Sequence, residues 1–399
     1  MTHPTAPAGL LRRMTSRSPY EQHRAATPLE LFFDLCFVVA VAQAGVRLVH
    51  AFAEGHFGSG VLGYVLVFFA IWWAWVNFTW FASAYDNDDV FYRLAVLVQI
   101  AGVLVLAAGV PRAFDDANWA VCIAGYVVMR LAMTCQWLRV ARHNSGAERA
   151  TALKYAVGLA LVQVGWFTVL FVPEGTRLYL FVVLAAAELS VPLVAERGFH
   201  TAWHPHHVAE RYGLFTIIVL GETVTAATVA VQEGLDEHEA LGELLSIAGG
   251  GLLIVFAAWW IYFAAPAQER LTSMKRAVQW GYGHLFILGS AAAIGAGIEV
   301  AVEQVTGQAH ISPVAATGTV TVPTALFLFT GWFLQARHVK RDVAEKALMP
   351  VTVLAVLACT FLGTWGVLAA GLVMSVTVAF GVALSARPDS DALRKPRAA

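Results

Sequence analysis

The chain is a succession of apolar stretches, each close to 20 residues long, joined by short polar connections. About 20 largely apolar residues are what an α-helix needs to cross the hydrocarbon core of a bilayer. Only 13% of the residues are charged, against about 25% in soluble domains. These features predict an all-α polytopic membrane protein, with the lipid bilayer as its principal partner.

Twelve stretches meet this length. The last two come from one apolar run, 348–385, which we divide at Gly363–Gly366, and a single long bent segment is the alternative. The predicted spans are 29–48, 61–84, 90–110, 117–138, 153–172, 177–195, 208–231, 243–264, 276–298, 314–335, 348–365 and 367–386.

The basic residues predict the orientation of these spans. With the N-terminus in the cytoplasm, 22 of the 26 Lys and Arg residues fall in inside segments. Only Arg47, Arg112 and Arg177 fall in outside loops, and Arg130 lies within a span. Such a bias follows the positive-inside rule. We therefore expect twelve spans in a bacterial cell membrane, with both termini cytoplasmic.

A weak internal repeat divides the spans into two halves. Glu30, Trp72-Trp73 and Arg93 recur as Glu210, Trp259-Trp260 and Arg276, at offsets of 180, 187 and 183 residues. Six spans per half give the halves the same orientation, as in transporters built from parallel repeats. The predicted organisation is a cytoplasmic tail 1–26, a first six-helix repeat 27–197, a second repeat 198–386 and a cytoplasmic tail 387–399.

Several classes of protein are disfavoured by what the chain contains. A net charge of −1 leaves no basic face for nucleic acid. The four cysteines lie in apolar stretches without CxxC spacing, which is typical of buried thiols and not of disulfides or metal ligands. No cleavable signal peptide is expected. Motifs of soluble enzymes are lacking, so we expect no enzyme activity, no cofactor and no metal.

Two motifs connect the chain with a known family. One is TPLELFFDLCFVVAVAQ (27–43), in which an acid, two aromatic residues and an aspartate open an apolar helix. The other is ERYGLFTIIVLGETV (210–224), and FFAIWWAWVNFTWFASAYD lies between them. Together they resemble the bacterial low temperature requirement A (LtrA) family over residues 20–385. The resemblance implies a multi-pass bacterial membrane protein linked to growth in the cold, and it implies no particular reaction.

Four charged side chains are predicted to lie deep in the spans: Asp34, Arg130, Glu188 and Glu222. A charge at the centre of a membrane helix costs roughly 2.5 kcal/mol or more, so each needs a partner or a purpose. Arg130 is expected to pair with Glu188 or Glu222. We predict a charged intramembrane core, and a purely structural ion-pair network is the alternative to a proton, cation or substrate site.

Charged residues also mark the predicted mouths of two helices, namely Glu30 in the first and Glu210 with Arg211 in the seventh. Glu30 and Asp34 are four residues apart and share a helix face. Glu30 occupies the first turn, where the helix dipole favours an anion. These residues form a predicted helix-mouth motif.

Uncharged polar and aromatic side chains complete the candidate set. Gln43, Asn77 and His284 fall within spans and are expected to make mostly interhelical hydrogen bonds, with the lining of a polar path as the alternative. An aromatic cluster at 72–81 is expected to be packing, with a ligand box as the alternative. The loop FHTAWHPHH (199–207) is expected to be solvated, although metal ligation or pH sensing is conceivable.

The leading hypothesis is a secondary transporter or permease, coupled to a proton, ion or small solute. A cation channel is a close relative of this idea. The alternatives are a non-transport membrane or envelope factor and, further away, a membrane-embedded enzyme acting on lipid-linked substrates.

Overall fold

The computed structural model describes residues 11–18, 21, 24–236, 240–264, 266–336 and 343–385, and the predicted C-terminal tail lies outside them. Within these residues the chain is helical and contains no strand. Short 3-10 segments occur at Val169–Phe171, Ala267–Arg270 and Thr360–Trp365, and a π-helical segment at Trp332–Ala336. The α-helices are α1 (Pro28–Ala53), α2 (Phe57–Tyr85), α3 (Val90–Asp115), α4 (Ala120–His143), α5 (Gly146–Thr168), α6 (Glu174–Ala195), α7 (Pro205–Asp236), α8 (Leu241–Phe263), α9 (Met274–Val305), α10 (Pro313–Gly331), α11 (Val343–Cys359) and α12 (Gly366–Ser385).

Eleven helical stretches of the described residues are long and apolar enough to cross a membrane. The predicted class of all-helical, multi-pass protein is therefore confirmed, whereas twelve crossings in two repeats stay a prediction. The last stretch, Lys346–Leu384, contains the break that we placed at 363–366. Gly363 there adopts a φ of 56°, in the region that favours glycine, and separates α11 from α12.

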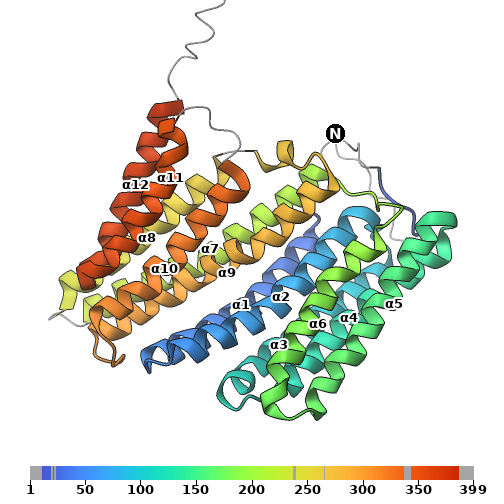
Figure 1. Cartoon of the computed structure of the whole chain (residues 1–399), viewed down its shortest axis with the longest axis horizontal. Helices are drawn as coiled ribbons and strands as arrows, with labels where there is room; N and C mark the ends of the chain where they lie inside the picture. The colour runs from blue at the N-terminus through green and yellow to red at the C-terminus, as the bar shows by residue number, and fades with distance from the viewer. Residues whose placement is uncertain are drawn as a thin grey trace, which may run out of the picture. The chain divides into compact units, whose positions relative to one another are not determined.

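Contacts divide the chain into two compact units. The first takes Met1–Leu48, Phe57–Ile218 and Ala267–Leu285, and the second takes the remaining residues. In the first unit α3, α4, α5 and α6 run side by side, each packed on the next, with α2 against α3 and α4 (Figure 1). In the second unit α12 packs on α8 and α11, and α10 packs on α11.

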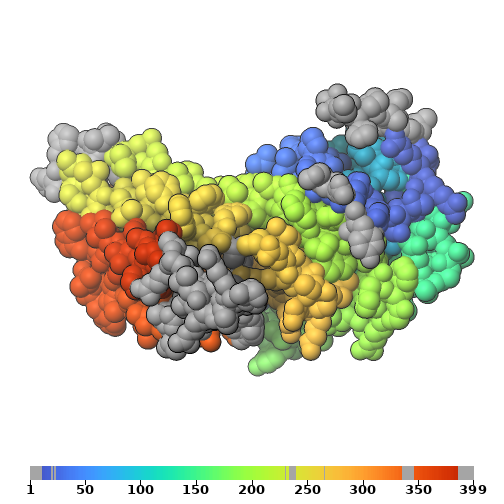
Figure 2. Space-filling model, turned by 90° about the horizontal axis from the view of Figure 1, so that it is seen from above, coloured from blue at the N-terminus to red at the C-terminus, as the bar shows by residue number. Residues whose placement is uncertain are grey.

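The segment 11–18, expected to belong to a cytoplasmic tail, packs onto the first unit. Met14 is fully buried, and its backbone N–H donates to Nδ1 of His143 at 3.2 Å. The amide of Asn144 donates to the Met14 carbonyl at 2.8 Å. In Figure 2 this deep-blue segment lies on the surface of the first unit. The chain before α1 therefore joins the ends of helices that are distant in sequence.

Close helix crossings depend on glycine. In the second unit, a Cβ atom on Gly250 of α8 would lie 2.5 Å from the backbone nitrogen of Leu368 in α12. The neighbouring Gly249 has nothing within 4 Å of such an atom. Small residues at membrane helix crossings let the two backbones approach, which explains why position 250 is a glycine.

We expect Gly250→Ala to destabilise the protein by about 1–3 kcal/mol, because the new methyl group meets backbone that cannot move aside. Thermal melting of the purified protein in detergent checks this. Gly249→Ala is the matched control and should melt at or slightly above the wild-type temperature, since alanine favours a helix. Equal melting temperatures for the two variants would contradict a close crossing of α8 and α12 at Gly250.

Candidate functional site

The first turn of α1 fixes one carboxylate of a buried charged cluster. Oγ1 of Thr27 accepts from the backbone N–H of Glu30 at 3.3 Å, and Oε2 of Glu30 accepts from the Thr27 backbone N–H at 2.7 Å. This reciprocal pair is a capping box, and Pro28 suits the first helical position because it has no N–H to satisfy. Glu30 is therefore held by its own helix and leaves Oε1 for other partners.

That second oxygen meets two basic side chains of α7. Oε1 of Glu30 lies 3.0 Å from Nη1 of Arg211 and 3.1 Å from Nε2 of His207. All three side chains are buried. Nδ1 of His207 is also buried and has no hydrogen-bond partner among the described residues.

Asp34, one turn further along α1, receives the other edge of the same guanidinium. Nη2 of Arg211 donates to Oδ1 of Asp34 at 2.6 Å, and Nε donates to Oδ2 at 3.1 Å. The indole N–H of Trp75 in α2 donates to Oδ1 at 2.6 Å. A two-point contact of this kind is the strongest geometry available to an Arg–carboxylate pair.

The pattern behind this cluster is a match between two helix faces. Glu30 and Asp34 are four residues apart on α1, and His207 and Arg211 are four residues apart on α7. Residues at this spacing share a face, so an acidic pair meets a basic pair. We call Glu30, Asp34, His207 and Arg211 the acid–base cluster. Its net charge is −1 with a neutral imidazole and zero with a protonated one.

A further buried carboxylate, Asp86, follows the end of α2. It lies 3.5 Å from Arg17. Burial raises the pKa of Asp86 to about 6, and the Glu30 carboxylate adds to the rise while Arg17 and Arg24 oppose it. Arg24 is itself buried and donates to the carbonyls of Ala82 and Ser83 at the end of α2.

A second buried cluster surrounds Glu188 of α6. Its two oxygens accept five hydrogen bonds at 2.9–3.2 Å from three other helices, α2, α4 and α5. The donors are Trp73, Tyr126, Arg130, Gln163 and Trp166. A carboxylate has about four lone-pair sites, so Glu188 is saturated. We call this group the Glu188 hub.

The two clusters suit different tasks. The Glu188 hub has no unused acceptor capacity, so it joins helices and leaves no room for a cation. The acid–base cluster has a histidine against a carboxylate and one more acid than guanidinium. It can therefore gain or lose a proton without leaving a large uncompensated charge, which is the requirement for a buried titrating site.

The structure brings together some predicted residues and not others. Arg130 lies against Glu188, one of its two expected partners. Asp34 lies against Arg211, which we had assigned to the helix mouth. Glu222 is half-buried and has no polar partner among the described residues. The contacts of Asp34 and of Arg130 thus belong to two separate clusters.

The remaining predicted residues lie outside these clusters. Glu210 is half-buried, with Oε2 buried and unpaired. Gln43 is half-buried. Asn77 donates to the Trp73 carbonyl at 2.8 Å, and His284 is buried with Nδ1 2.7 Å from the Trp280 carbonyl. None of these four side chains joins the acid–base cluster.

The histidine-rich segment differs from the expected solvated loop. His204 and His207 are buried, and Nε2 of His204 lies 2.7 Å from the Glu21 carbonyl. Among the described residues no group of three His, Cys, Asp or Glu side chains could hold a metal ion. His207 belongs to the loop for which pH sensing was an alternative, and sequence reasoning did not single it out as a partner of Glu30. Its four-residue spacing from Arg211 was the available signal.

Fold and clusters first define a class: a helical, multi-pass membrane protein that buries ion-paired acidic and basic side chains. Comparison with known sequences then gives the family. The profile of the bacterial low temperature requirement A protein (LtrA) matches residues 25–386. The chain therefore belongs to the LtrA family, as the motifs at 27–43 and 210–224 predicted.

A relative is found in Rhizobium meliloti (strain 1021), where it bears the name uncharacterized protein RA0937. It is 29% identical over 285 residues, which are 67% of this chain and 67% of that protein.

We expect Arg211→Gln to destabilise the fold more than Asp34→Asn. Arg211 pairs with two carboxylates, and Asp34→Asn leaves the Arg211–Glu30 pair intact. Breaking one buried pair typically costs roughly 3–5 kcal/mol. Denaturant or thermal unfolding in detergent measures the difference. Arg93→Gln, which removes a half-exposed pair with Asp88, is the control and should cost less than about 1 kcal/mol. If Asp34→Asn destabilised the protein more than Arg211→Gln, the conclusion that Arg211 is shared between two carboxylates would be refuted.

We expect Asp86→Asn to remove a pH dependence of stability. With an ordinary pKa of 3.8 and a folded-state value of about 6, the folded chain holds a proton that the unfolded chain has lost between these values. The contribution of Asp86 to the free energy of unfolding therefore falls as pH rises through about 4 to 6, by on the order of 3 kcal/mol. Melting curves across this range should be flatter for Asp86→Asn, and Asp88→Asn on the same connection is the control. A wild-type profile for Asp86→Asn would contradict the assignment.

Proposed function

We propose that this LtrA-family protein is a proton-coupled secondary transporter or permease of the bacterial plasma membrane. The observation that carries the proposal is the acid–base cluster: a buried His207 in contact with Glu30, and a guanidinium shared between Glu30 and Asp34. Ionisable residues inside membrane proteins commonly mark ion and proton pathways. We propose no catalytic step and no cofactor for this site.

The coupling rests on the charge balance of the cluster. A proton on His207 or Glu30 cancels the excess negative charge of the cluster. When that proton leaves, two ionised carboxylates again share the single positive charge of Arg211. The α1–α7 contact is therefore bistable with respect to a single proton. A solute or ion that binds one of the two arrangements better would be linked to proton binding by mass action.

The proposed topology is twelve spans in two parallel halves, with both termini cytoplasmic. Support comes from the first unit, where connections assigned to the same side of the membrane meet. Arg139 near the end of α4 pairs with Asp89 between α2 and α3, and the backbone N–H of His204 before α7 donates to Ser83 Oγ at 3.0 Å.

The tryptophan pairs that match in the predicted repeat differ in exposure, since Trp72 and Trp73 are 1% exposed and Trp259 and Trp260 are 46% and 49% exposed. The two halves would thus have diverged in use.

A second candidate is a non-transport membrane factor that supports the envelope in the cold. The Glu188 hub favours it, because a saturated carboxylate that ties three helices to α6 is a structural device. Under this reading the acid–base cluster would be a second structural tie. The link to growth at low temperature suits either candidate.

Reconstituted proteoliposomes test the transport proposal. We expect pH-dependent currents or uptake across a panel of ions and small solutes, under an imposed potential or pH gradient. Glu30→Gln and His207→Gln should abolish the pH dependence because each removes a proposed proton acceptor, and Asp34→Asn should abolish it because it removes the excess negative charge of the cluster. Glu54→Gln, an exposed carboxylate beyond α1, is the matched control and should behave as wild type.

Size-exclusion profiles must show that the variants fold. Wild-type liposomes without current or uptake over the whole panel would overturn the transport proposal. Variants that fold and keep normal pH-dependent flux would remove the acid–base cluster from it. Glu222→Gln asks separately whether the proposed charged core extends along α7.

A further inference from the structure

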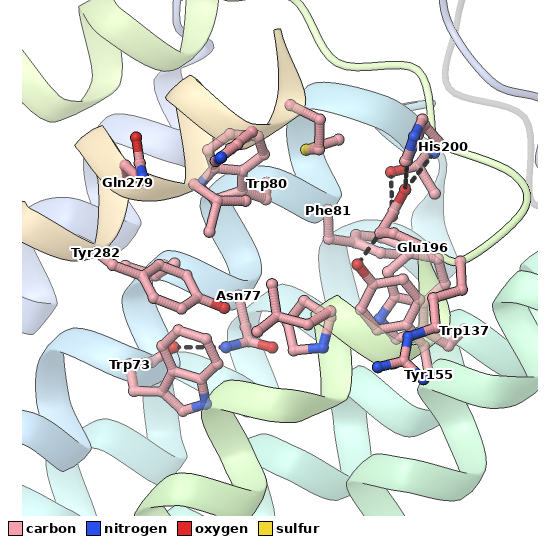
Figure 3. A pocket seen from close by; sticks show the side chains of 18 of the residues that line it. Trp73, Asn77, Trp80, Phe81, Trp137, Tyr155, Glu196, His200, Gln279 and Tyr282 are labelled. Carbon is pink, nitrogen blue, oxygen red and sulfur yellow. Dashed lines mark hydrogen bonds and ion pairs between the residues drawn. The ribbon is translucent and has the colours of Figure 1, made fainter.

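The first unit contains a cavity of about 490 Å³ that shares Trp73 with the Glu188 hub and includes none of the residues of the acid–base cluster. Its walls come from the C-terminal halves of α2 and α4, the start of α5, the end of α6 with the connection after it, and the start of α9. Figure 3 shows Trp73, Trp80, Trp137, Tyr155 and Tyr282 around this space. The volume lies within the usual range for small-molecule sites, about 300–1,000 Å³.

Three of the aromatic walls contribute mainly apolar surface to the cavity, because their polar atoms are bonded elsewhere. The indole N–H of Trp73 donates to Glu188, and the hydroxyl of Tyr282 donates to the Leu189 carbonyl at 3.0 Å. The hydroxyl of Tyr155 donates to Glu196 at 2.9 Å. The body of a ligand here would consequently have to be apolar.

The rim of the cavity carries an excess of positive charge. Arg197 and Lys275 both line it and are exposed, and His200 lies beside them. The Glu196 carboxylate at the same rim is already engaged, with Thr201 donating to both of its oxygens at 2.8 Å. The unsatisfied charge at the rim is therefore cationic, which disfavours an organic cation among the rings.

One polar group inside the wall remains available. Nδ2 of Asn77 is bonded to the Trp73 carbonyl, so the amide oxygen points away from that bond and toward the middle of the cavity (Figure 3). An amide oxygen accepts hydrogen bonds, so a ligand hydroxyl could bind there. Trp73, Trp80 and Phe81, from the aromatic cluster predicted to be packing, thus also line a cavity.

We propose that this cavity binds a phospholipid with an anionic headgroup. Its apolar part would lie against the rings of Trp73, Trp80 and Tyr282, and its phosphate would contact Arg197 and Lys275. The same helix ends lie at the cytoplasmic surface in the predicted topology, and basic pockets between helices on that side suit anionic lipids. The site is independent of the proposed transport activity.

Tryptophan quenching by brominated lipids tests this site in the full-length protein. The protein is placed in nanodiscs of phosphatidylcholine that contain a small fraction of brominated phosphatidylglycerol or brominated phosphatidylcholine. We expect stronger quenching by the anionic lipid. Arg197→Gln and Lys275→Gln should each weaken the apparent affinity about fivefold, since each cation near a membrane surface contributes comparably.

Arg276→Gln is the matched control, because Arg276 is exposed next to Lys275 and does not line the cavity. Competition with soluble probes separates the other occupants. Dodecyl phosphate should displace the brominated lipid, whereas inorganic phosphate and dodecyltrimethylammonium should not.

Equal quenching by the two brominated lipids would mean bulk lipid only and would overturn the proposal. Displacement by inorganic phosphate would replace it with a free-phosphate site, and displacement by dodecyltrimethylammonium would replace it with a cation cage. Loss of binding in Arg276→Gln as large as in Lys275→Gln would show a diffuse surface effect and no site.

Discussion

The shared guanidinium of Arg211 is the interaction on which the first unit most depends. Glu30, Asp34 and Arg211 are buried in a largely apolar interior. An unpaired charge there would cost several kcal/mol. Pairing them requires that one face of α1 meet one face of α7. The capping box at Thr27 and the N–H of Trp75 then hold the carboxylates in place from either side. A local feature, two acids four residues apart, thus constrains a contact between residues 177 positions apart in the chain.

The contrast with the Glu188 hub explains why burial alone does not mark a functional charge. Glu188 and Asp34 are equally buried and each faces an arginine. Around Glu188, however, neutral N–H and O–H donors occupy the remaining acceptor sites. Around Glu30 one neighbouring group is the imidazole of His207, a side chain that exists in a neutral and a charged form. A functional buried carboxylate is therefore distinguished from a structural one by the groups that complete its set of hydrogen-bonding partners.

Hydropathy and spacing were sufficient for the helices, the break at Gly363 and the burial of Asp34, Arg130 and Glu188, because apolar length and the cost of a lone charge are local properties. Partner choice was not local. Depth along a helix follows from 1.5 Å per residue, but the direction in which a side chain points depends on packing, so Glu222 was placed in a core where it has no described partner. Likewise Arg211 was assigned to a helix mouth, and His207 to a solvated loop, because the face of α7 that meets α1 is defined only by tertiary contact.

One helix, α2, links all three sites of the first unit. Trp73 and Trp75 are two residues apart, so they point about 200° apart around the helix axis. Trp73 accordingly donates to the Glu188 hub and Trp75 to the acid–base cluster, while Asn77 and Trp80 reach the cavity. All four side chains are neutral, which lets α2 stabilise buried carboxylates without adding a charge that would need its own partner. A small rotation of α2 would break both indole hydrogen bonds at once. The aromatic run at 72–81 is therefore a structural framework that fixes the relative geometry of the three sites.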